Sequence, residues 1–183
     1  MKKIFGVVFI TVIILTIVGI IFYTWQTSLE QEEMASGKLI ITSPAFKDGE
    51  KIPSKYTCDG ENINPELNIE GIPEGTKSLV LIVDDPDAPA GTWVHWVVFN
   101  IPVPPNATEI KIAENSVPGE EGMNDFKKTS YGGPCPPSGS HRYYFRVYAL
   151  DTKLNLDFAT KSDVELAMKN HILAKGELIG RFR

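Results

Sequence analysis

The stretch Ser78-Leu-Val-Leu-Ile-Val-Asp-Asp85 decides the fold, together with the similar stretch from Trp93 to Ile101. Both are rich in β-branched or aromatic residues and are bounded by proline or glycine, which is typical of buried strands rather than helices. A third run of this kind covers His141 to Leu150, and shorter β-prone runs lie at 39–42 and 67–72. These runs predict a mainly β domain.

One helix is expected near the end of the chain. Ser162-Asp-Val-Glu165 has the pattern of a capping box, and Val164, Ala167, Met168 and His171 follow on one helical stripe. We expect this helix to end at about Lys175, with Gly176 as the stop signal and 177–182 as a last strand. The segment 103–131 is long and rich in Pro, Gly, Glu and Asn, so we expect it to be partly irregular.

The first 35 residues have a different composition from the rest. Residues 4–25 contain no charged side chain, and this length is enough for a helix to cross a bilayer. Lys2 and Lys3 precede the stretch and acidic residues follow it, which predicts a cytoplasmic N-terminus at 1–3 and an extracytoplasmic body. We therefore predict a transmembrane signal anchor at 4–25, a tether at 26–37, a domain at 38–183 and a single-pass membrane localisation. A cleaved signal peptide is the alternative, but small residues suited to cleavage do not follow the apolar stretch directly.

Length and charge exclude several classes of protein. The body has an ordinary single-domain length, and the whole chain of 183 residues has a formal net charge of −5. This acidic balance gives no indication of a nucleic-acid partner. The two cysteines are too few for a disulfide-dense scaffold.

Polar residues stand at the ends of three predicted strands. If side chains alternate strictly, His95 shares a face with Val97, Phe99 and Ile101, and His141 shares one with Tyr143, Phe145, Val147 and Ala149. Asp85 ends the face formed by Leu79, Leu81 and Val83. Aligning these ends predicts a polar cluster at the rim of the core. The residues alone also allow a purely structural reading, in which each histidine is hydrogen-bonded and Asp85-Pro86-Asp87 is an ordinary turn.

The chain resembles the phosphatidylethanolamine-binding proteins in two longer motifs. Asp84-Asp-Pro-Asp-Ala-Pro89 followed by Trp93-Val-His-Trp96 is similar to the first family signature, and the stretch from Tyr131 to Tyr143 is similar to the second. Flanking matches, such as Tyr148-Ala-Leu-Asp151, agree with the bacterial and archaeal Raf-kinase-inhibitor-like branch. The resemblance covers roughly 38–183. An N-terminal leader is outside the family pattern, and many microbial members have glycine before the residue matching His171.

The resemblance implies an antiparallel Greek-key β-sandwich with a C-terminal helix and a small pocket for anionic groups. The expected ligand is an anionic small molecule or a phospholipid head group. The matching pocket and wall residues are Asp85, Asp87, Trp93, His95, Tyr131, Gly133, Pro136, His141 and Tyr143, with Cys135 also on the wall. Imidazoles suit this role because they can donate hydrogen bonds to phosphate oxygens when protonated. We expect Arg142, which has the opposite parity to His141, to form a structural pair with an acidic residue.

Other chemistry stays open at this stage. A zinc site from His95, His141 and Asp85 is conceivable by ligand type, but no tight ligand spacing supports it, and we expect no metal and no cofactor. No Gly-x-Ser-x-Gly elbow is present, so we do not expect an enzyme, although Cys135 with His141 could be considered as nucleophile and base. A disulfide between Cys58 and Cys135 is the simpler expectation for an extracytoplasmic domain.

Three function hypotheses follow. The first is a membrane-tethered domain that binds an anionic small molecule or head group. The second is an inhibitor or modulator of a protease or kinase, which would act through the pocket rim and the 103–131 segment. The third is a hydrolase.

Overall fold

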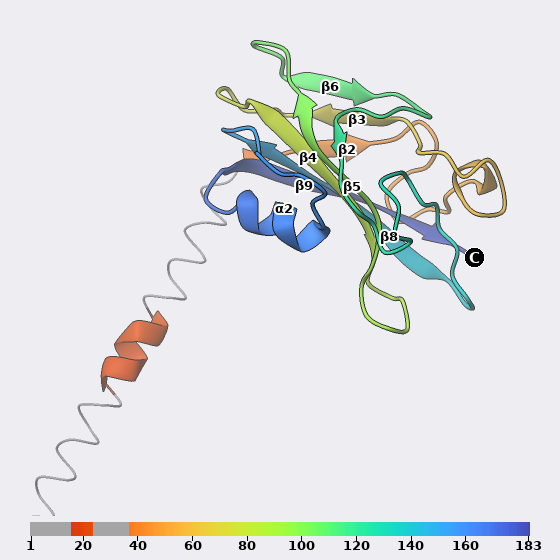
Figure 1. Cartoon of the computed structure of the whole chain (residues 1–183), viewed down its shortest axis with the longest axis horizontal. Helices are drawn as coiled ribbons and strands as arrows, with labels where there is room; N and C mark the ends of the chain where they lie inside the picture. Colours follow the sequence, from red (N-terminus) through yellow and green to blue (C-terminus); the bar gives the residue numbers. More distant parts are fainter. Residues whose placement is uncertain (1–15, 24–36) are drawn as a thin grey trace, which may run out of the picture. The chain divides into compact units, whose positions relative to one another are not determined.

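Two β-sheets pack face to face between residues 37 and 183 (Figure 1). The structure is a computed structural model that describes residues 16–23 and 37–183. Its elements are β1 (Gly37–Lys38), β2 (Ile40–Thr42), the 3₁₀ helix η1 (Ser54–Tyr56), β3 (Leu67–Glu70), β4 (Ser78–Asp85), β5 (Trp93–Pro102), β6 (Glu109–Ile112), β7 (Glu120–Glu121), β8 (His141–Leu150), α2 (Lys161–Ala167) and β9 (Ile172–Phe182). The prediction of a mainly β domain with a C-terminal helix is confirmed.

The larger sheet has six strands in the order β1-β9-β8-β4-β5-β7, and the smaller has three in the order β2-β3-β6. All pairs are antiparallel except β1 with β9. The central strand β4 pairs with β5 on one side and with β8 on the other. The three strands that carry the predicted polar residues are therefore neighbours.

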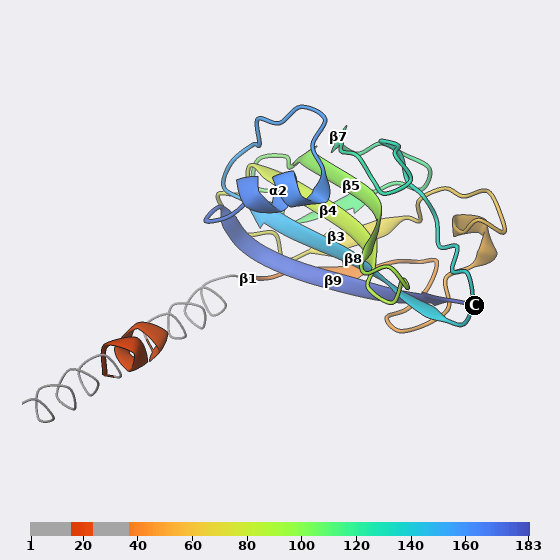
Figure 2. The ribbon, with the colours of Figure 1, turned by 60° about the horizontal axis from the view of Figure 1, so that its bottom comes forward.

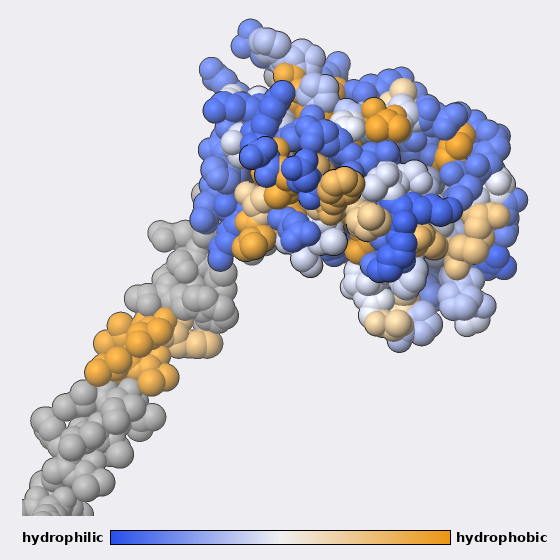
Figure 3. All heavy atoms as spheres, in the orientation of Figure 1, coloured by the Kyte–Doolittle hydropathy of each residue, from blue (hydrophilic) through white to orange (hydrophobic). Residues whose placement is uncertain are grey.

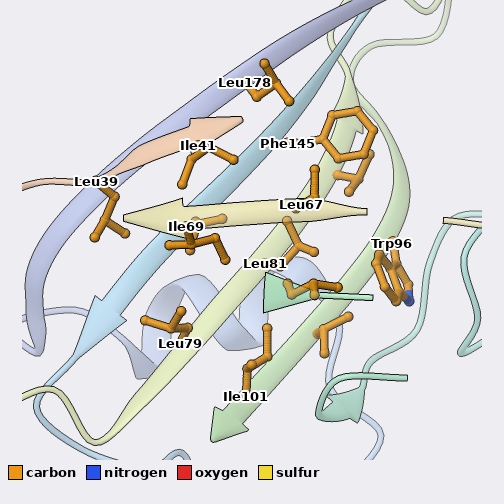
Figure 4. Close-up of a cluster of buried hydrophobic side chains, with 14 of the residues drawn as sticks. Leu39, Ile41, Leu67, Ile69, Leu79, Leu81, Trp96, Ile101, Phe145 and Leu178 are labelled. Atoms are coloured by element: carbon orange, nitrogen blue, oxygen red, sulfur yellow. The ribbon is translucent and has the colours of Figure 1, made fainter. Parts of the chain in front are cut away.

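The main core lies between the two sheets. Figure 4 shows side chains from both sheets meeting there, including Ile69 of β3, Leu81 of β4 and Phe145 of β8. Each of these three side chains is at most 1% exposed. Burying an aliphatic or aromatic side chain of this size contributes roughly 1.5–3 kcal/mol. This core holds the ends of β4, β5 and β8 in fixed register.

A second apolar cluster lies on the other face of the six-stranded sheet, which α2 covers (Figure 2). Val80 and Ile82 of β4 pack there with Val164 of α2 and with Met168, the residue that follows this helix. Because β4 is buried on both faces, its sequence is a continuous apolar run instead of an alternating one.

The C-terminal helix is shorter than predicted. It begins after Thr160, whose side chain and backbone form a capping box with Asp163, two residues before the box expected at Ser162. It ends at Ala167, and β9 begins at Ile172, so the prediction of a helix to about Lys175 was wrong. The reason is that β9 pairs with β8 along its whole length, which only the folded sheet can show. The last strand therefore starts five residues earlier than predicted.

The prediction for the leader also needs correction. The described part of the leader is a helical segment at 16–23, and no helix among the described residues is long and apolar enough to cross a membrane. The predicted transmembrane helix and the single-pass localisation are therefore wrong for the part of the chain that the structure describes. The remainder of the predicted span 4–25, and 26–36 of the predicted tether, lie outside the described residues.

The face of the 37–183 unit shown in Figure 3 is largely hydrophilic, and its apolar residues form separate spots. The large apolar side chains with the greatest exposure in this unit are Phe158, Leu166 and Val117. They come from different segments. Clusters of buried polar side chains and cavities are therefore the features of this unit that bear on function.

Candidate functional site

Asp85 stands at the end of β4 and organises the turn that follows. Its side chain is buried, and one carboxylate oxygen accepts a hydrogen bond from the backbone N–H of Asp87 at 2.8 Å. The other oxygen lies 2.7 Å from Nδ1 of His141, the first residue of β8. The carboxylate therefore fixes the orientation of the His141 ring and leaves its Nε2 without a hydrogen bond among the described residues.

His95 reaches the same region through an irregularity in β5. Val83 pairs with Trp96, but the next residue, Asp84, pairs with Val94, so His95 is the extra residue of a β-bulge. The His95 ring contacts the Tyr143 ring edge-on, with 5.2 Å between the ring centroids. The bulge thus brings a β5 histidine to the face on which β8 carries Tyr143.

The bulge overturns part of the parity prediction. Strict alternation placed Val97 and Phe99 on the face of His95, but both belong to the cluster under α2. Ile101 returns to the main core because a second register shift follows, at Asn100, which has a positive φ of 54°. The expected faces of Asp85 and His141 are confirmed. Val83, on the same face of β4 as Asp85, and Phe145, on the same face of β8 as His141, both lie in the main core.

The His95 ring has a defined tautomer when it is neutral. Its Nδ1 lies 2.6 Å from the carbonyl oxygen of Gly132, and because a carbonyl only accepts, Nδ1 must carry the proton. Burial lowers the pKa of His95 below its ordinary value, so the neutral form is favoured. Nε2 then presents a lone pair and makes no hydrogen bond within 37–183.

Tyr143 supplies the most unusual group of the cluster. Its side chain is 0% exposed, and its hydroxyl has no partner at ordinary hydrogen-bond distance among the described residues, although the Asp85 carboxylate and the Cys135 backbone are close enough to influence it. Burial, together with the negative charge of Asp85, raises the pKa of this hydroxyl. The group therefore stays protonated and can donate a hydrogen bond.

Aromatic rings close one side of the cluster. The Phe126 ring lies 5.5 Å from the Trp93 ring and 5.3 Å from the His95 ring, measured between centroids. Gly132 allows this contact, because a Cβ there would come within 2.6 Å of the Phe126 ring. Our sequence reading missed Phe126, since the segment that carries it was expected only to be irregular. Its aromatic character within a polar run was the one available signal.

Asp87 is held by Arg142 and not by a histidine. The guanidinium donates two hydrogen bonds to its carboxylate, at 2.9 and 2.6 Å, and the Arg142 backbone N–H donates a third at 2.9 Å. The hydrogen bonds from Arg142 lower the pKa of Asp87 to about 2. The expectation that Arg142 pairs with an acidic residue is met. Asp87 therefore links the turn after β4 to the start of β8.

The remaining predicted residues lie on the segment 131–136. Tyr131 packs its ring on Trp96, with 5.5 Å between centroids, and its hydroxyl donates to the Tyr56 carbonyl at 3.0 Å. Gly133 donates its N–H to Asn62 at 2.7 Å. Pro136 is buried. Tyr131 and Gly133 line a cavity distinct from the His95–Tyr143 contact.

Cys58 and Cys135 form a disulfide, with 5.5 Å between their Cα atoms. The backbone N–H of Cys58 also donates to the carbonyl of Pro134 at 3.1 Å. These links join the turn after η1 to the segment that supplies the Gly132 carbonyl for His95. No group of three or more His, Cys, Asp or Glu side chains in the described ranges is arranged to hold a metal ion.

Comparisons with known proteins identify relatives of this chain. A UPF0098 protein of Methanothermobacter thermautotrophicus is 52% identical over 148 residues, which are 76% of this chain and 95% of that protein. A UPF0098 protein of Aquifex aeolicus is 48% identical over 78% of this chain and 87% of its own length. The names of these relatives attribute no catalytic activity to them.

Two solved structures share the fold. A phosphatidylethanolamine-binding protein homologue from Chlamydia trachomatis superposes with a TM-score of 0.74 at 41% identity, covering 81% of this chain and 99% of its own. YbcL of E. coli gives 0.71 at 31% identity, covering 80% and 99%. The phosphatidylethanolamine-binding protein family matches residues 42–183. The chain therefore belongs to the phosphatidylethanolamine-binding protein family, in the branch that includes YbcL.

Proposed function

We propose that this protein binds a small anionic group, phosphate or the phosphoryl head group of a phospholipid, at Asp85, His95, His141 and Tyr143. The observation that carries the proposal is the buried Tyr143 hydroxyl, which has no partner at ordinary hydrogen-bond distance within the described residues. A buried donor left unpaired costs about 1–3 kcal/mol. A ligand oxygen that accepts from this hydroxyl would remove that cost on binding.

The histidines support the same class of ligand. Each ring uses Nδ1 within the protein, and each Nε2 is left for a ligand. An anion beside a neutral imidazole favours its protonation, which converts Nε2 from an acceptor to a donor. The Asp85 carboxylate, 2.7 Å from Nδ1 of His141, fixes the orientation of that ring. The name of the family, which refers to phosphatidylethanolamine, agrees with a phosphoryl group as ligand.

The test is isothermal titration calorimetry of the full chain. Inorganic phosphate, phosphorylethanolamine and the soluble short-chain lipid dihexanoylphosphatidylethanolamine serve as probes. Equal affinity for all three indicates recognition of the phosphoryl group itself, whereas tighter binding of the lipid indicates a head group with its glycerol ester. A His95→Ala, His141→Ala double variant should bind at least tenfold more weakly than the parent, because two charge-assisted hydrogen bonds are lost. Unchanged binding by this variant would show that the site is wrong.

Tyr143→Phe gives a finer test of the same proposal. The substitution removes only the unpartnered hydroxyl, so it should leave stability equal or increased while it weakens phosphate binding about tenfold. A variant that loses stability but keeps full affinity would mean that the hydroxyl serves the fold and not a ligand.

A further inference from the structure

A cavity of about 460 Å³ is lined in part by residues of the segment 131–135. This volume is in the range of small-molecule sites, which are about 300–1,000 Å³. The aromatic rings of Trp96, Phe126 and Tyr131 contribute to its lining, together with asparagine and serine side chains. Asp85, His95, His141 and Tyr143 do not line it. The proposed anion site therefore leaves this cavity without a role.

Glu121 gives the cavity a negative charge. It belongs to the two-residue strand β7, which pairs with β5, and it is half-buried. One of its carboxylate oxygens accepts a hydrogen bond from the indole N–H of Trp96 at 2.6 Å. Its second oxygen has no hydrogen bond, and no cationic side chain in the described part of the chain forms an ion pair with it. Glu114, by contrast, accepts hydrogen bonds from both Lys55 and Tyr56.

The aromatic walls favour a cation at the same place. The Tyr131 ring packs edge-on against Trp96, and its hydroxyl is tied to the Tyr56 carbonyl, so its position is fixed. Ring faces carry negative electrostatic potential and attract ammonium groups most strongly where water is partly excluded. Lys128 also lines the cavity, but it is exposed, and water screens its charge. A carboxylate beside aromatic rings is the arrangement that recognises an organic ammonium ion.

We infer that this cavity is a second binding site, which takes a small organic cation with a primary or quaternary ammonium group. Glu121 supplies the counter-charge, and Trp96, Phe126 and Tyr131 supply the aromatic wall. Phe126 and Gly132 line this cavity and also contact His95, so the two sites are adjacent. The Gly132 carbonyl faces His95 on one side, and the Gly133 N–H is bonded to Asn62 on the other. The inference does not depend on the proposed anion-binding function.

The test uses a pair of probes that differ only in charge. Choline and its neutral carbon analogue 3,3-dimethylbutan-1-ol have almost the same shape, and binding to the full chain is measured by calorimetry and by tryptophan fluorescence. Choline should bind about tenfold or more tightly than the neutral analogue. Equal binding of the two probes, or no binding of choline at 100 mM, would overturn the inference.

Variants locate the cation. Glu121→Gln keeps an acceptor for the Trp96 indole and removes the charge, so choline should bind about tenfold more weakly. Glu74→Gln is the matched control, because Glu74 is exposed and does not line the cavity. If Glu121→Gln fails to fold, Val117→Lys replaces it. Val117 lines the cavity and is 67% exposed, so the substitution adds a repelling charge at the rim without disturbing the core.

Two further outcomes are decisive. Choline binding that persists in the His95→Ala, His141→Ala variant supports a second site. Its loss in that variant, with Glu121→Gln unaffected, would place the cation at the anion site and would contradict the inference.

Discussion

Asp84 and Asp85 are adjacent carboxylates on β4, and both are buried, with 0% and 3% of their surface exposed. Because side chains alternate along a strand, they point to opposite faces of the sheet. Asp84 lies on the α2 side and forms ion pairs with Arg146 of β8 and with Lys161 of α2, the latter at 2.5 Å. Asp85 lies on the main-core side, where one of its carboxylate oxygens lies 2.7 Å from Nδ1 of His141.

The difference between the two carboxylates is in the chemistry of their partners. Arginine and lysine carry a permanent positive charge at neutral pH, so Asp84 is balanced whether or not a ligand is present. An imidazole carries no permanent positive charge, so Asp85 has no fixed counter-charge of this kind. Buried charge with fixed partners is typical of structure, and buried charge with a titratable partner is typical of a binding site.

Asp84→Asn should have the largest effect on stability. The substitution leaves Arg146 and Lys161 without their shared counter-charge, and we expect a loss of about 3 kcal/mol in the free energy of unfolding. This value is at the low end for buried pairs because the two cationic side chains are 27% and 22% exposed. Urea unfolding measures it. Phosphate affinity should be unchanged under conditions where the variant is folded, and a large loss of affinity would contradict the division of roles.

Asp85→Asn should have the reverse profile. The amide can still accept from the Asp87 N–H but cannot provide a charged acceptor for His141, so stability should fall by about 1–2 kcal/mol. Phosphate binding should weaken at least tenfold, because the imidazolium form of His141 loses its counter-ion. Calorimetry and urea unfolding of the same sample measure both quantities. The contrast between the two carboxylates is wrong if Asp85→Asn keeps the phosphate affinity of the parent and loses as much stability as Asp84→Asn.

On the binding side of the sheet, the ionisation of His95 should make the free energy of unfolding depend on pH. Its pKa is lowered in the folded state, so the unfolded chain takes up a proton more readily. Stability is therefore fully present above the ordinary histidine pKa of about 6.5 and decreases as pH falls from there towards the folded pKa. The slope from one proton is at most about 1.4 kcal/mol per pH unit. Urea unfolding at several pH values measures it, and His95→Asn should flatten the slope. An unchanged slope in that variant would assign the effect to other groups.

The protonation of His95 should also affect the affinity for anions. Sulfate keeps its charge across the range, so its affinity reports only the protein. If anion binding favours the imidazolium form, sulfate should bind several-fold more tightly at pH 6 than at pH 8. Titration of the full chain at both pH values measures this, and an affinity independent of pH would mean that the histidines bind in one protonation state.

The strands of this fold could be predicted because their signal is local. The apolar run 78–85 corresponds exactly to β4, and 141–150 to β8. The end of the helix could not be predicted in this way, because 169–175 has no decisive pattern of its own. Only the pairing of Ile172 and the following residues with β8 makes that segment a strand.

The candidate site was predictable in its residue types but not in its geometry. The family motifs identified Asp85, His95 and His141. The position of His95, however, depends on a bulge that the pairing with β4 reveals and that strict alternation misses. Phe126 and Glu121 lie in a segment without strong periodicity, and their roles follow from contacts across the fold. The aromatic character of Phe126 in a polar run is a weak local signal, but it does not identify the contacts that this ring makes.

The smallest expected effect concerns Asp87, the third acidic residue of this stretch. Its pKa is lowered to about 2 by Arg142, so it contributes stability above its ordinary pKa of about 4, and this contribution is lost as pH falls from 4 to 2. The Arg142 side chain is 41% exposed, and solvent screens the pair, so Asp87→Asn should cost only about 1 kcal/mol. Unfolding measured at pH 7 and pH 3 should show the cost at pH 7 and a smaller one at pH 3. Sulfate affinity should stay within about twofold of the parent, because the turn is still closed by the Asp85 carboxylate and the Asp87 backbone N–H. A large loss of affinity would show that Asp87, like Asp85, contributes to anion binding. The division into structural and binding carboxylates would then be wrong for Asp87.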